Sequence, residues 1–315
     1  MAFLYQMLGS KVWPPRDTKP DLTGRTLLIT GANSGLGIII GVRSVEKGEE
    51  AKRAILAQTH PNNVTIDVYY LDMLDYASIE AFASRPPCLQ GISLWIRIAL
   101  QVNLVSTTLL ALLLLPKLLS SKKDDFTPVL ELVGSGTHQR IPQLLPDTDN
   151  PEQDILEVYN SEASFQAFGF IQQYSLTKLF LMYVQWHLVK LVNDDAGSPR
   201  VYVVVVGPGP TQSALARDFQ DKSLGVRLAV NTLNLMSKTA EQGARTYLSG
   251  LMLGEQGHGQ FWQWDSINKP AKWCSDPNAI VRSERVWAGV LAALEKDLPG
   301  TRKLVAGVKD GLSAD

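Results

Sequence analysis

Short apolar runs alternate with longer amphipathic segments along most of the chain. The runs that predict β-strands are Arg25–Thr30, Ile38–Arg43, Asn63–Leu71, Pro128–Val133 and Pro199–Val206. The segments that predict helices are Val45–Leu56, Tyr76–Ser84, Leu100–Leu119, Tyr174–Val192, residues 215–240, Ala240–Leu253 and Val281–Leu298, which closes the chain. Strands that alternate with helices predict an α/β fold built on a parallel sheet.

The two ends of this pattern suggest the domain boundaries. Residues 1–22 carry Pro14, Pro15 and Pro20 and predict an extended N-terminal arm, and residues 23–315 predict one domain. Residues 137–170, with three further prolines, predict a long insertion before the Tyr174 helix.

Composition narrows the class of protein. With 45% hydrophobic residues, 19% charged residues and a formal net charge of −1, the 315-residue chain predicts a folded protein without a nucleic-acid surface. Cys88 and Cys274 form no C-x-x-C pair, and the four histidines have no ligand spacing. We therefore expect a reducing compartment, no metal, and histidines in surface or loop positions.

The longest apolar run, Leu109–Leu115, does not predict a membrane span. Widening it to Leu104–Leu119 brings in Ser, Thr, Pro and Lys, which favours a buried core helix. Met1–Leu8 is too short for a signal sequence and has no basic flank before it. The expected location is the cytoplasm.

A glycine cluster follows the first predicted strand. Gly31, Gly35 and Gly37 are spaced G-x-x-x-G-x-G directly after Thr30. Glycines in this place let the backbone turn sharply and approach a pyrophosphate at the N-terminus of the next helix. An ordinary loop is the alternative, but the position after a buried strand favours a dinucleotide-binding turn.

A tyrosine and a lysine stand one helical turn apart in Tyr174-Ser-Leu-Thr-Lys178. Side chains at i and i+4 share a helix face, and an ammonium beside a phenol stabilises the phenolate. Such a tyrosine can exchange a proton with a substrate oxygen, as a hydride-transfer reaction requires. On this spacing alone, an amphipathic helix with an exposed lysine is the better interpretation.

Taken together, these motifs resemble those of the short-chain dehydrogenases/reductases. The resemblance runs from about Leu22 to the C-terminus and rests on four motifs in the family's order: Thr30–Gly37, the Asn103 helix, Ser135 with Tyr174 and Lys178, and Pro208-Gly209. The residues of three segments are most similar to those of the retinol-dehydrogenase-like and fungal reductase branch, namely Gly41–Gly48, Gln101–Asn103 and Tyr174–Leu179. The resemblance implies a doubly wound, Rossmann-like sheet and a dimer or tetramer.

The resemblance also implies the roles of the catalytic residues. Tyr174 would donate or accept the proton, and Lys178 would lower the pKa of Tyr174 and hold the nicotinamide ribose. Ser135 would bind the substrate oxygen, and Asn103 would kink its helix and position a water. Simpler interpretations are a turn hydroxyl for Ser135 and a backbone-bonded helix amide for Asn103.

The cofactor-binding residues come from the same resemblance. They are Gly31, Asn33, Ser34, Gly35, Leu36, Gly37, Arg43, Asp72, Asn103, Tyr174, Lys178, Pro208, Gly209 and Ser213. Asp72 would bind the adenine amino group, with a helix N-cap as its alternative role. Arg43 ends the second predicted strand without an acidic neighbour, and a cation there pairs with a 2′-phosphate, which favours NADP(H) over NAD(H).

Two parts of the family's pattern are missing from the cofactor half. A helix is expected after Gly37, but Ile38 begins the next strand at once, and Ser44 can then cap the helix Val45–Leu56. The family's Asn-Asn-Ala-Gly strand, expected between Asp72 and Asn103, is also absent. The pattern thus lacks one helix and one strand, either because the protein has diverged or because the gene was assembled with exons missing.

The sequence predicts an NADP(H)-dependent oxidoreductase that interconverts a carbonyl and an alcohol on an apolar small molecule. Phe165, Phe168 and Phe170 in the insertion suit an apolar substrate, and packing of the insertion explains them equally well. One alternative is a non-catalytic or cofactor-deficient relative. Another is a sugar-nucleotide epimerase or dehydratase, which needs more than the roughly 100 residues that follow Gly207.

Overall fold

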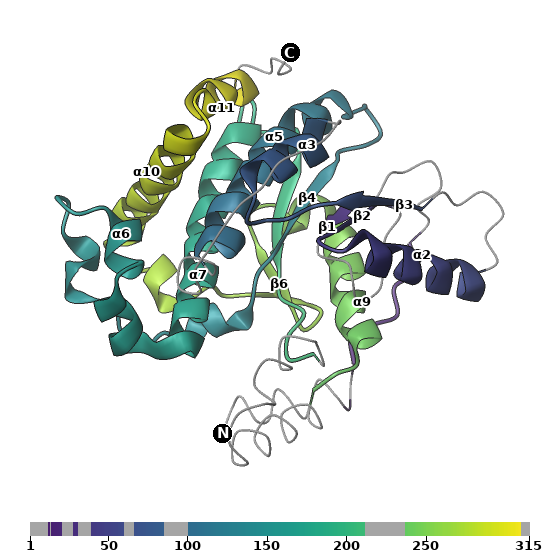
Figure 1. The fold of residues 1–315 in the computed structure, drawn as a ribbon, viewed down its shortest axis with the longest axis horizontal. Helices are drawn as coiled ribbons and strands as arrows, with labels where there is room; N and C mark the ends of the chain where they lie inside the picture. The colour runs from purple at the N-terminus through teal and green to yellow at the C-terminus, as the bar shows by residue number, and fades with distance from the viewer. Residues whose placement is uncertain are drawn as a thin grey trace. The chain divides into compact units, whose positions relative to one another are not determined.

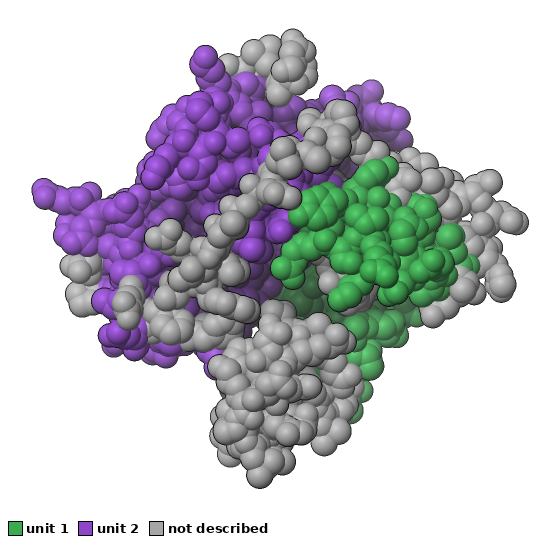
Figure 2. Space-filling model, viewed as in Figure 1, with its two compact units in different colours: residues 1–71, 206–252, 262–266 green, residues 72–205, 253–261, 267–315 purple. Residues whose placement is uncertain are grey.

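The computed structural model describes residues 12, 14–20, 28–30, 39–59, 66–84, 100–211 and 237–309, and its contacts divide the chain into two compact units. Unit 1 comprises residues 1–71, 206–252 and 262–266, and unit 2 comprises residues 72–205, 253–261 and 267–315 (Figure 2). The α/β class predicted from the sequence is confirmed. The predicted boundary between an N-terminal arm and one domain of residues 23–315 stays a prediction.

The first sheet, in unit 1, has the order β1-β2-β3. Its strands are β1 (Leu28–Thr30), β2 (Ile39–Val42) and β3 (Asp67–Tyr70), and each pairing is parallel. Helix α2 (Val45–Thr59) follows β2 and begins where Ser44 Oγ accepts a hydrogen bond from the Lys47 amide at 3.3 Å. The predicted second strand and its capped helix are therefore confirmed.

Close packing holds α2 against this sheet. A Cβ at Gly48 would lie 2.4 Å from Cγ1 of Val68 and 2.7 Å from Cγ2 of Val42, so only glycine permits this approach. Val42 and Ile66 form a small buried core, against which Ile55, Leu56 and Val68 pack.

The second sheet has the order β4-β5-β6-β7. Its strands are β4 (Val129–Val133), β5 (Tyr202–Val206), β6 (Phe261–Gln263) and β7 (Ser266–Asn268). Trp264 and Asp265 join β6 to β7 with φ values of 60° and 50°, which is the backbone of a two-residue hairpin turn. The sequence analysis missed this hairpin because glycine and asparagine, the usual residues of such a turn, are absent.

Helices make up most of unit 2 (Figure 1). They are α3 (Tyr76–Ser84), the π-helix η1 (Gln101–Ser106), α5 (Thr107–Ser120), α6 (Ile155–Tyr159), α7 (Glu162–Val192), α10 (Ala279–Asp297) and α11 (Thr301–Lys309), with the 3₁₀ turns η2 (Gly136–Arg140), η3 (Pro146–Asp149), η5 (Gly254–Gly257) and η6 (Lys272–Cys274). Helix α7 packs against α5, α6, α10 and α11, and its residues from Leu176 to Val192 supply much of the buried core. The prediction that the helix ending near Leu298 closes the chain was wrong, because α11 follows it.

The insertion of residues 137–170 is largely helical. It contains η3, α6 and the first part of α7, which breaks at Gly169 with a φ of 66°. The ring of Phe168 stacks on that of Tyr159 at 6.0 Å, so packing accounts for this phenylalanine. The side chains of Phe165 and Phe170 lie outside the described residues.

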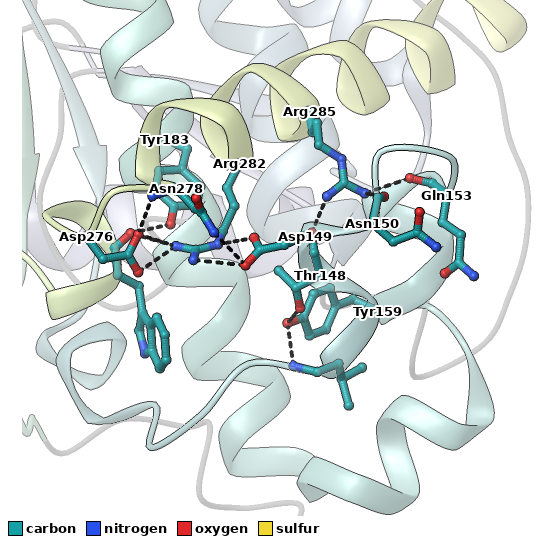
Figure 3. A network of polar contacts seen from close by, with 12 residues as sticks. Thr148, Asp149, Asn150, Gln153, Tyr159, Tyr183, Asp276, Asn278, Arg282 and Arg285 are labelled. Carbon is teal, nitrogen blue, oxygen red and sulfur yellow. Dashed lines mark hydrogen bonds and ion pairs between the residues drawn. The ribbon is translucent and has the colours of Figure 1, made fainter.

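Two arginines of α10 tie the insertion to the body of unit 2 (Figure 3). The guanidinium of Arg282, 3% exposed, pairs with Asp149 at 2.7 Å and with Asp276 at 2.8 Å. Arg285 donates to the backbone carbonyls of Thr148, Asn150 and Gln153, which lie in and beside η3. These contacts fix a proline-rich segment that has few apolar residues of its own.

The remaining helix, α9 (Ala240–Leu251), belongs to unit 1. It begins with a capping box in which Thr239 and Gln242 exchange hydrogen bonds. At Gly243 it lies so close to Thr211 that a Cβ would meet that side chain at 2.7 Å.

By length and composition, one helical stretch in the described part of the chain could cross a membrane, namely Gln101–Ser120. Half of its most apolar window is buried inside the fold, and Leu109, Leu112 and Leu115 on it are at most 1% exposed. Its packing against α3, α7 and α11 agrees with the core helix predicted from the sequence.

Candidate functional site

The structure brings together Ser135, Tyr174 and Lys178, all in unit 2. Ser135 follows β4 and caps η2, because its Oγ accepts a hydrogen bond from the Thr137 amide at 3.3 Å. Tyr174 and Lys178 lie on α7 beyond the break at Gly169, one turn apart. The turn-hydroxyl interpretation of Ser135 is therefore correct, and the same hydroxyl is close enough to Tyr174 to act on the pKa of its phenol.

The side-chain hydroxyls of Tyr174 and Ser135 lie close enough for Ser135 to act on the pKa of the phenol. Burial raises the pKa of the Tyr174 phenol, and the Ser135 hydroxyl offsets part of that rise. The Thr137 hydroxyl donates to Ser135 Oγ at 3.1 Å. Two hydroxyls that meet near the end of a strand, with a third hydroxyl behind them, form a group that can bind and protonate one substrate oxygen.

Lys178 is a buried lysine and not a surface one. Its side chain is 7% exposed, so the exposed-lysine interpretation of the Y-x-x-x-K spacing is wrong. Its ammonium donates to the backbone carbonyl of Val133 at 2.8 Å and lies 5.6 Å from the centre of the Tyr174 ring. Burial lowers the pKa of Lys178 to about 8. The lowering of the Tyr174 pKa by Lys178 stays a prediction.

Asn103 lies in η1, where the helix widens to a π-helix before α5. Its side-chain nitrogen donates to Oγ1 of Thr177 at 3.2 Å, so this amide bonds a side chain and not the backbone. Thr177 in turn donates to the carbonyl of Tyr174 at 2.8 Å. A π-helix inside a longer helix is a common feature of functional sites. The predicted kink at Asn103 stays a prediction.

Asp72, at the start of unit 2, does not cap the helix that follows. Its Oδ1 accepts from the Leu74 amide at 2.9 Å, whereas Asp75 accepts from the Ala77 amide at 3.0 Å and thereby caps α3. The alternative of a helix N-cap at Asp72 is therefore wrong. Its predicted role toward adenine stays a prediction.

Unit 1 carries the other predicted cofactor residues that the structure describes. Arg43 follows β2 and is exposed, and Pro208-Gly209 follow β5. Gly209 has a φ of 71°, and a Cβ there would lie 2.8 Å from the Trp264 ring. The predicted residues Gly31, Asn33, Ser34, Gly35, Leu36, Gly37 and Ser213 lie outside the described residues.

Sequence reasoning missed Thr177, although it lies inside the Tyr174–Lys178 motif. Its hydroxyl links Asn103 to the Tyr174 helix, and no spacing rule predicts that contact. Two predictions about histidines were also wrong, because His138 and His187 are 0% and 5% exposed. Within the described ranges, no group of His, Cys, Asp and Glu side chains could hold a metal ion.

Curated relatives cover nearly the whole chain. It is 35% identical to the short-chain dehydrogenase/reductase ffsI of Aspergillus flavipes over 327 residues, with 93% of this chain and 92% of the relative covered. It is 31% identical to the short-chain dehydrogenase/reductase phmF of Phaeosphaeria nodorum, with 95% and 94% covered. No family model matches the chain.

Solved structures show the same fold. An uncharacterized protein from Mycobacterium paratuberculosis matches with a TM-score of 0.54 at 18% identity over 94% of this chain and 97% of its own. A short chain dehydrogenase from Salmonella enterica serovar Typhi matches with a TM-score of 0.50 at 18% identity, over 78% and 98%. The predicted Rossmann-like fold is thereby confirmed.

The match to the Aspergillus protein also shows a difference in length. The aligned stretch is 327 residues long, whereas 93% of a 315-residue chain is about 293 residues, so about 34 aligned positions have no residue of this chain. A difference of this size is consistent with the helix and the strand that the sequence pattern lacks.

Proposed function

Because the chain belongs to the short-chain dehydrogenase/reductase family, we propose that it is an NADP(H)-dependent oxidoreductase that interconverts a carbonyl and an alcohol on an apolar small molecule. The observation that carries this proposal is the cluster of the Ser135 and Tyr174 hydroxyls with the buried ammonium of Lys178, which lies 5.6 Å from the centre of the Tyr174 ring. A non-catalytic relative has no need to keep a buried ammonium beside these two hydroxyls.

In this proposal the three side chains handle one proton and one oxygen. The Ser135 hydroxyl donates a hydrogen bond to the carbonyl oxygen of the substrate and positions it beside Tyr174. The Tyr174 hydroxyl donates its proton to that oxygen as the alcohol forms and takes it back in the reverse direction. Lys178, protonated below its pKa of about 8, favours the phenolate that is left behind.

The donors present fit a nicotinamide dinucleotide. An ammonium has three N–H donors, and Lys178 uses one on the Val133 carbonyl, which leaves two for the hydroxyls of a ribose. In unit 1, the exposed guanidinium of Arg43 can pair with a 2′-phosphate in a bidentate manner. The cofactor, when bound, supplies or accepts the hydride.

Residues 137–173 would wall the substrate pocket, because loops on a rigid sheet carry specificity. Most of residues 211–238, which the sequence assigns the same role, lie outside the described residues. The ion pairs of Arg282 hold η3 of the insertion in one position. We further propose that the enzyme is cytoplasmic, needs neither nucleic acid nor a membrane, and acts as a dimer or tetramer.

Replacement of the tyrosine tests the proposal. In an assay of NADPH oxidation with a panel of apolar aldehydes and ketones, Tyr174→Phe should lose at least a hundredfold in kcat. Its affinity for NADPH and its stability should stay close to those of the wild type. Tyr202→Phe, on β5, is the matched control and should keep full activity. Turnover by Tyr174→Phe within a few-fold of the wild type would contradict the proposed role.

One observation favours a second candidate, a relative that has lost cofactor binding. Strands β1 and β2 are parallel neighbours, but only eight residues, 31–38, connect them. A crossover between parallel strands usually takes a dozen residues or more. A chain that binds neither NADPH nor NADH while it is folded would support this candidate.

A further inference from the structure

Lys238 is a buried lysine that the proposed chemistry does not use. It precedes α9 in unit 1 and is 1% exposed. Its backbone forms a parallel bridge with Thr211, and its amide donates to the Pro210 carbonyl at 3.1 Å. The lysine is therefore fixed against the turn of residues 208–211 that follows β5.

The ammonium of Lys238 has no hydrogen-bond acceptor among the described residues. It lies 4.7 Å from the centre of the Trp264 ring, where the cation–π attraction offsets only part of the cost of burial. The carboxylate of Asp265 acts on it at longer range but is already hydrogen-bonded to the Arg16 amide at 2.7 Å. Burial lowers the pKa of Lys238 to about 8, so the group is mostly charged at neutral pH.

The partner ring is held in place by the local backbone. Trp264 has a φ of 60°, which is costly for a residue with a large side chain. The ring lies so close to Gly209 that a Cβ at that position would be 2.8 Å away. The Trp264 ring therefore contacts both Gly209 and the buried ammonium of Lys238, and the three residues form one packed cluster.

We propose that Lys238 is an anion-binding residue that takes a phosphate or carboxylate group of a ligand lying against the turn of residues 208–211. Three N–H donors that have no acceptor among the described residues are costly on a buried cation, and an anionic oxygen is the acceptor that compensates best. The N-terminus of α9 begins two residues later, and its dipole favours an anion in the same region.

Two sources could supply this anionic group. One is the diphosphate of the dinucleotide, and the other is a carboxylate on the substrate. The first case rests on the proposed function, whereas the second does not require a cofactor. Both predict that loss of the ammonium weakens anion binding, so the choice of probe separates them.

The test compares Lys238→Met with the wild type by calorimetry. The probes are inorganic pyrophosphate, NADP⁺ and benzoate, with benzamide as the neutral counterpart of benzoate. Lys272→Met is the matched control, because Lys272 also lies over a tryptophan, 4.3 Å from the Trp273 ring, but is exposed. Tryptophan fluorescence, with Trp264→Phe to identify the signal, gives a second measure of occupancy.

We expect Lys238→Met to weaken binding of at least one anionic probe by about ten- to a hundredfold, the loss typical of a charged hydrogen bond. Benzamide binding and the Lys272→Met control should be unchanged. A loss for NADP⁺ and pyrophosphate identifies the cofactor as the source, and a loss for benzoate alone identifies the substrate.

Equal binding of all anionic probes by the wild type and Lys238→Met would overturn the inference, as would a folded wild type that binds no anion. NADPH binding that is unaffected by Lys238→Met would leave the proposed function intact. Benzoate binding that depends on Lys238 in a chain without cofactor affinity would support this site and contradict the proposed function.

Discussion

The buried charge of Lys178 should make stability depend on pH in a way that one substitution removes. In the folded chain the pKa of Lys178 falls from 10.5 to about 8, so between these values the unfolded state holds a proton that the folded state has lost. Stability therefore rises with pH across this window. Between pH 7 and pH 10 the rise contributed by Lys178 amounts to about 2.5 kcal/mol.

Lys178→Met removes this contribution. At pH 7 the variant avoids a burial cost of about 3 kcal/mol but loses the hydrogen bond to the Val133 carbonyl, which costs about 1–3 kcal/mol. The variant should therefore match or exceed the wild type at pH 7 and fall behind it at pH 10. Other titrating groups, including Lys238, cancel in the difference between the two proteins.

Urea unfolding of both proteins from pH 7 to pH 10 measures this difference. The exposed Lys117→Met is the matched control and should follow the wild type at every pH. Two parallel stability curves for the wild type and Lys178→Met would show that Lys178 titrates as an exposed lysine. That result would refute the burial on which its proposed catalytic role depends.

Two further predictions concern stability. Arg282→Met should cost about 2–3 kcal/mol in urea unfolding at pH 7, somewhat less than a fully buried pair because Asp149 is partly exposed. Because Arg282 lowers the pKa of Asp149, that loss should shrink as the pH falls below about 4, where Asp149 takes up a proton in the unfolded chain before it does so in the folded one. Gly209→Ala should cost about 2 kcal/mol or more, since it adds a clash with Trp264 to the strain of a positive φ. Gly197→Ala, with a φ of 83° and open space around it, should cost only the backbone strain, and equal costs for the two variants would contradict the contact.

The sequence predicted well what depends on local pattern. Periodicity placed α3, and the serine cap before Val45 placed the start of α2. Ser135, Tyr174 and Lys178 could be grouped from their motifs, and the structure brings them together.

Contacts between distant residues were not readable from the pattern. The pairing of Arg282 with Asp149 spans 133 residues, and the bond from Asn103 to Thr177 spans 74. The hairpin of β6 and β7 depends on two residues, Trp264 and Asp265, that have positive φ values although neither is glycine. The two contacts form only when the chain is folded, and in the hairpin tertiary packing imposes a backbone conformation that the local residues do not favour.

The sequence pattern predicts that the cofactor half lacks one helix and one strand of the family's fold. Two observations show that this chain is short. Only eight residues link β1 to β2, and about 34 positions of the alignment with the Aspergillus protein have no residue of this chain. The residues proposed to transfer the proton, Ser135, Tyr174 and Lys178, lie in unit 2. Catalysis by this chain therefore depends on whether the shortened half still holds a dinucleotide.

A calorimetric titration of the folded chain with NADPH, and with NADH alongside, tests this claim most directly. The account predicts micromolar binding of NADPH, weaker binding of NADH, and a loss of about tenfold for NADPH alone in Arg43→Ala. Arg53 is also an exposed arginine but lies on α2, and Arg53→Ala should bind as the wild type does. A folded chain that binds neither dinucleotide would contradict the proposed activity, and the family relationship would then describe its ancestry alone.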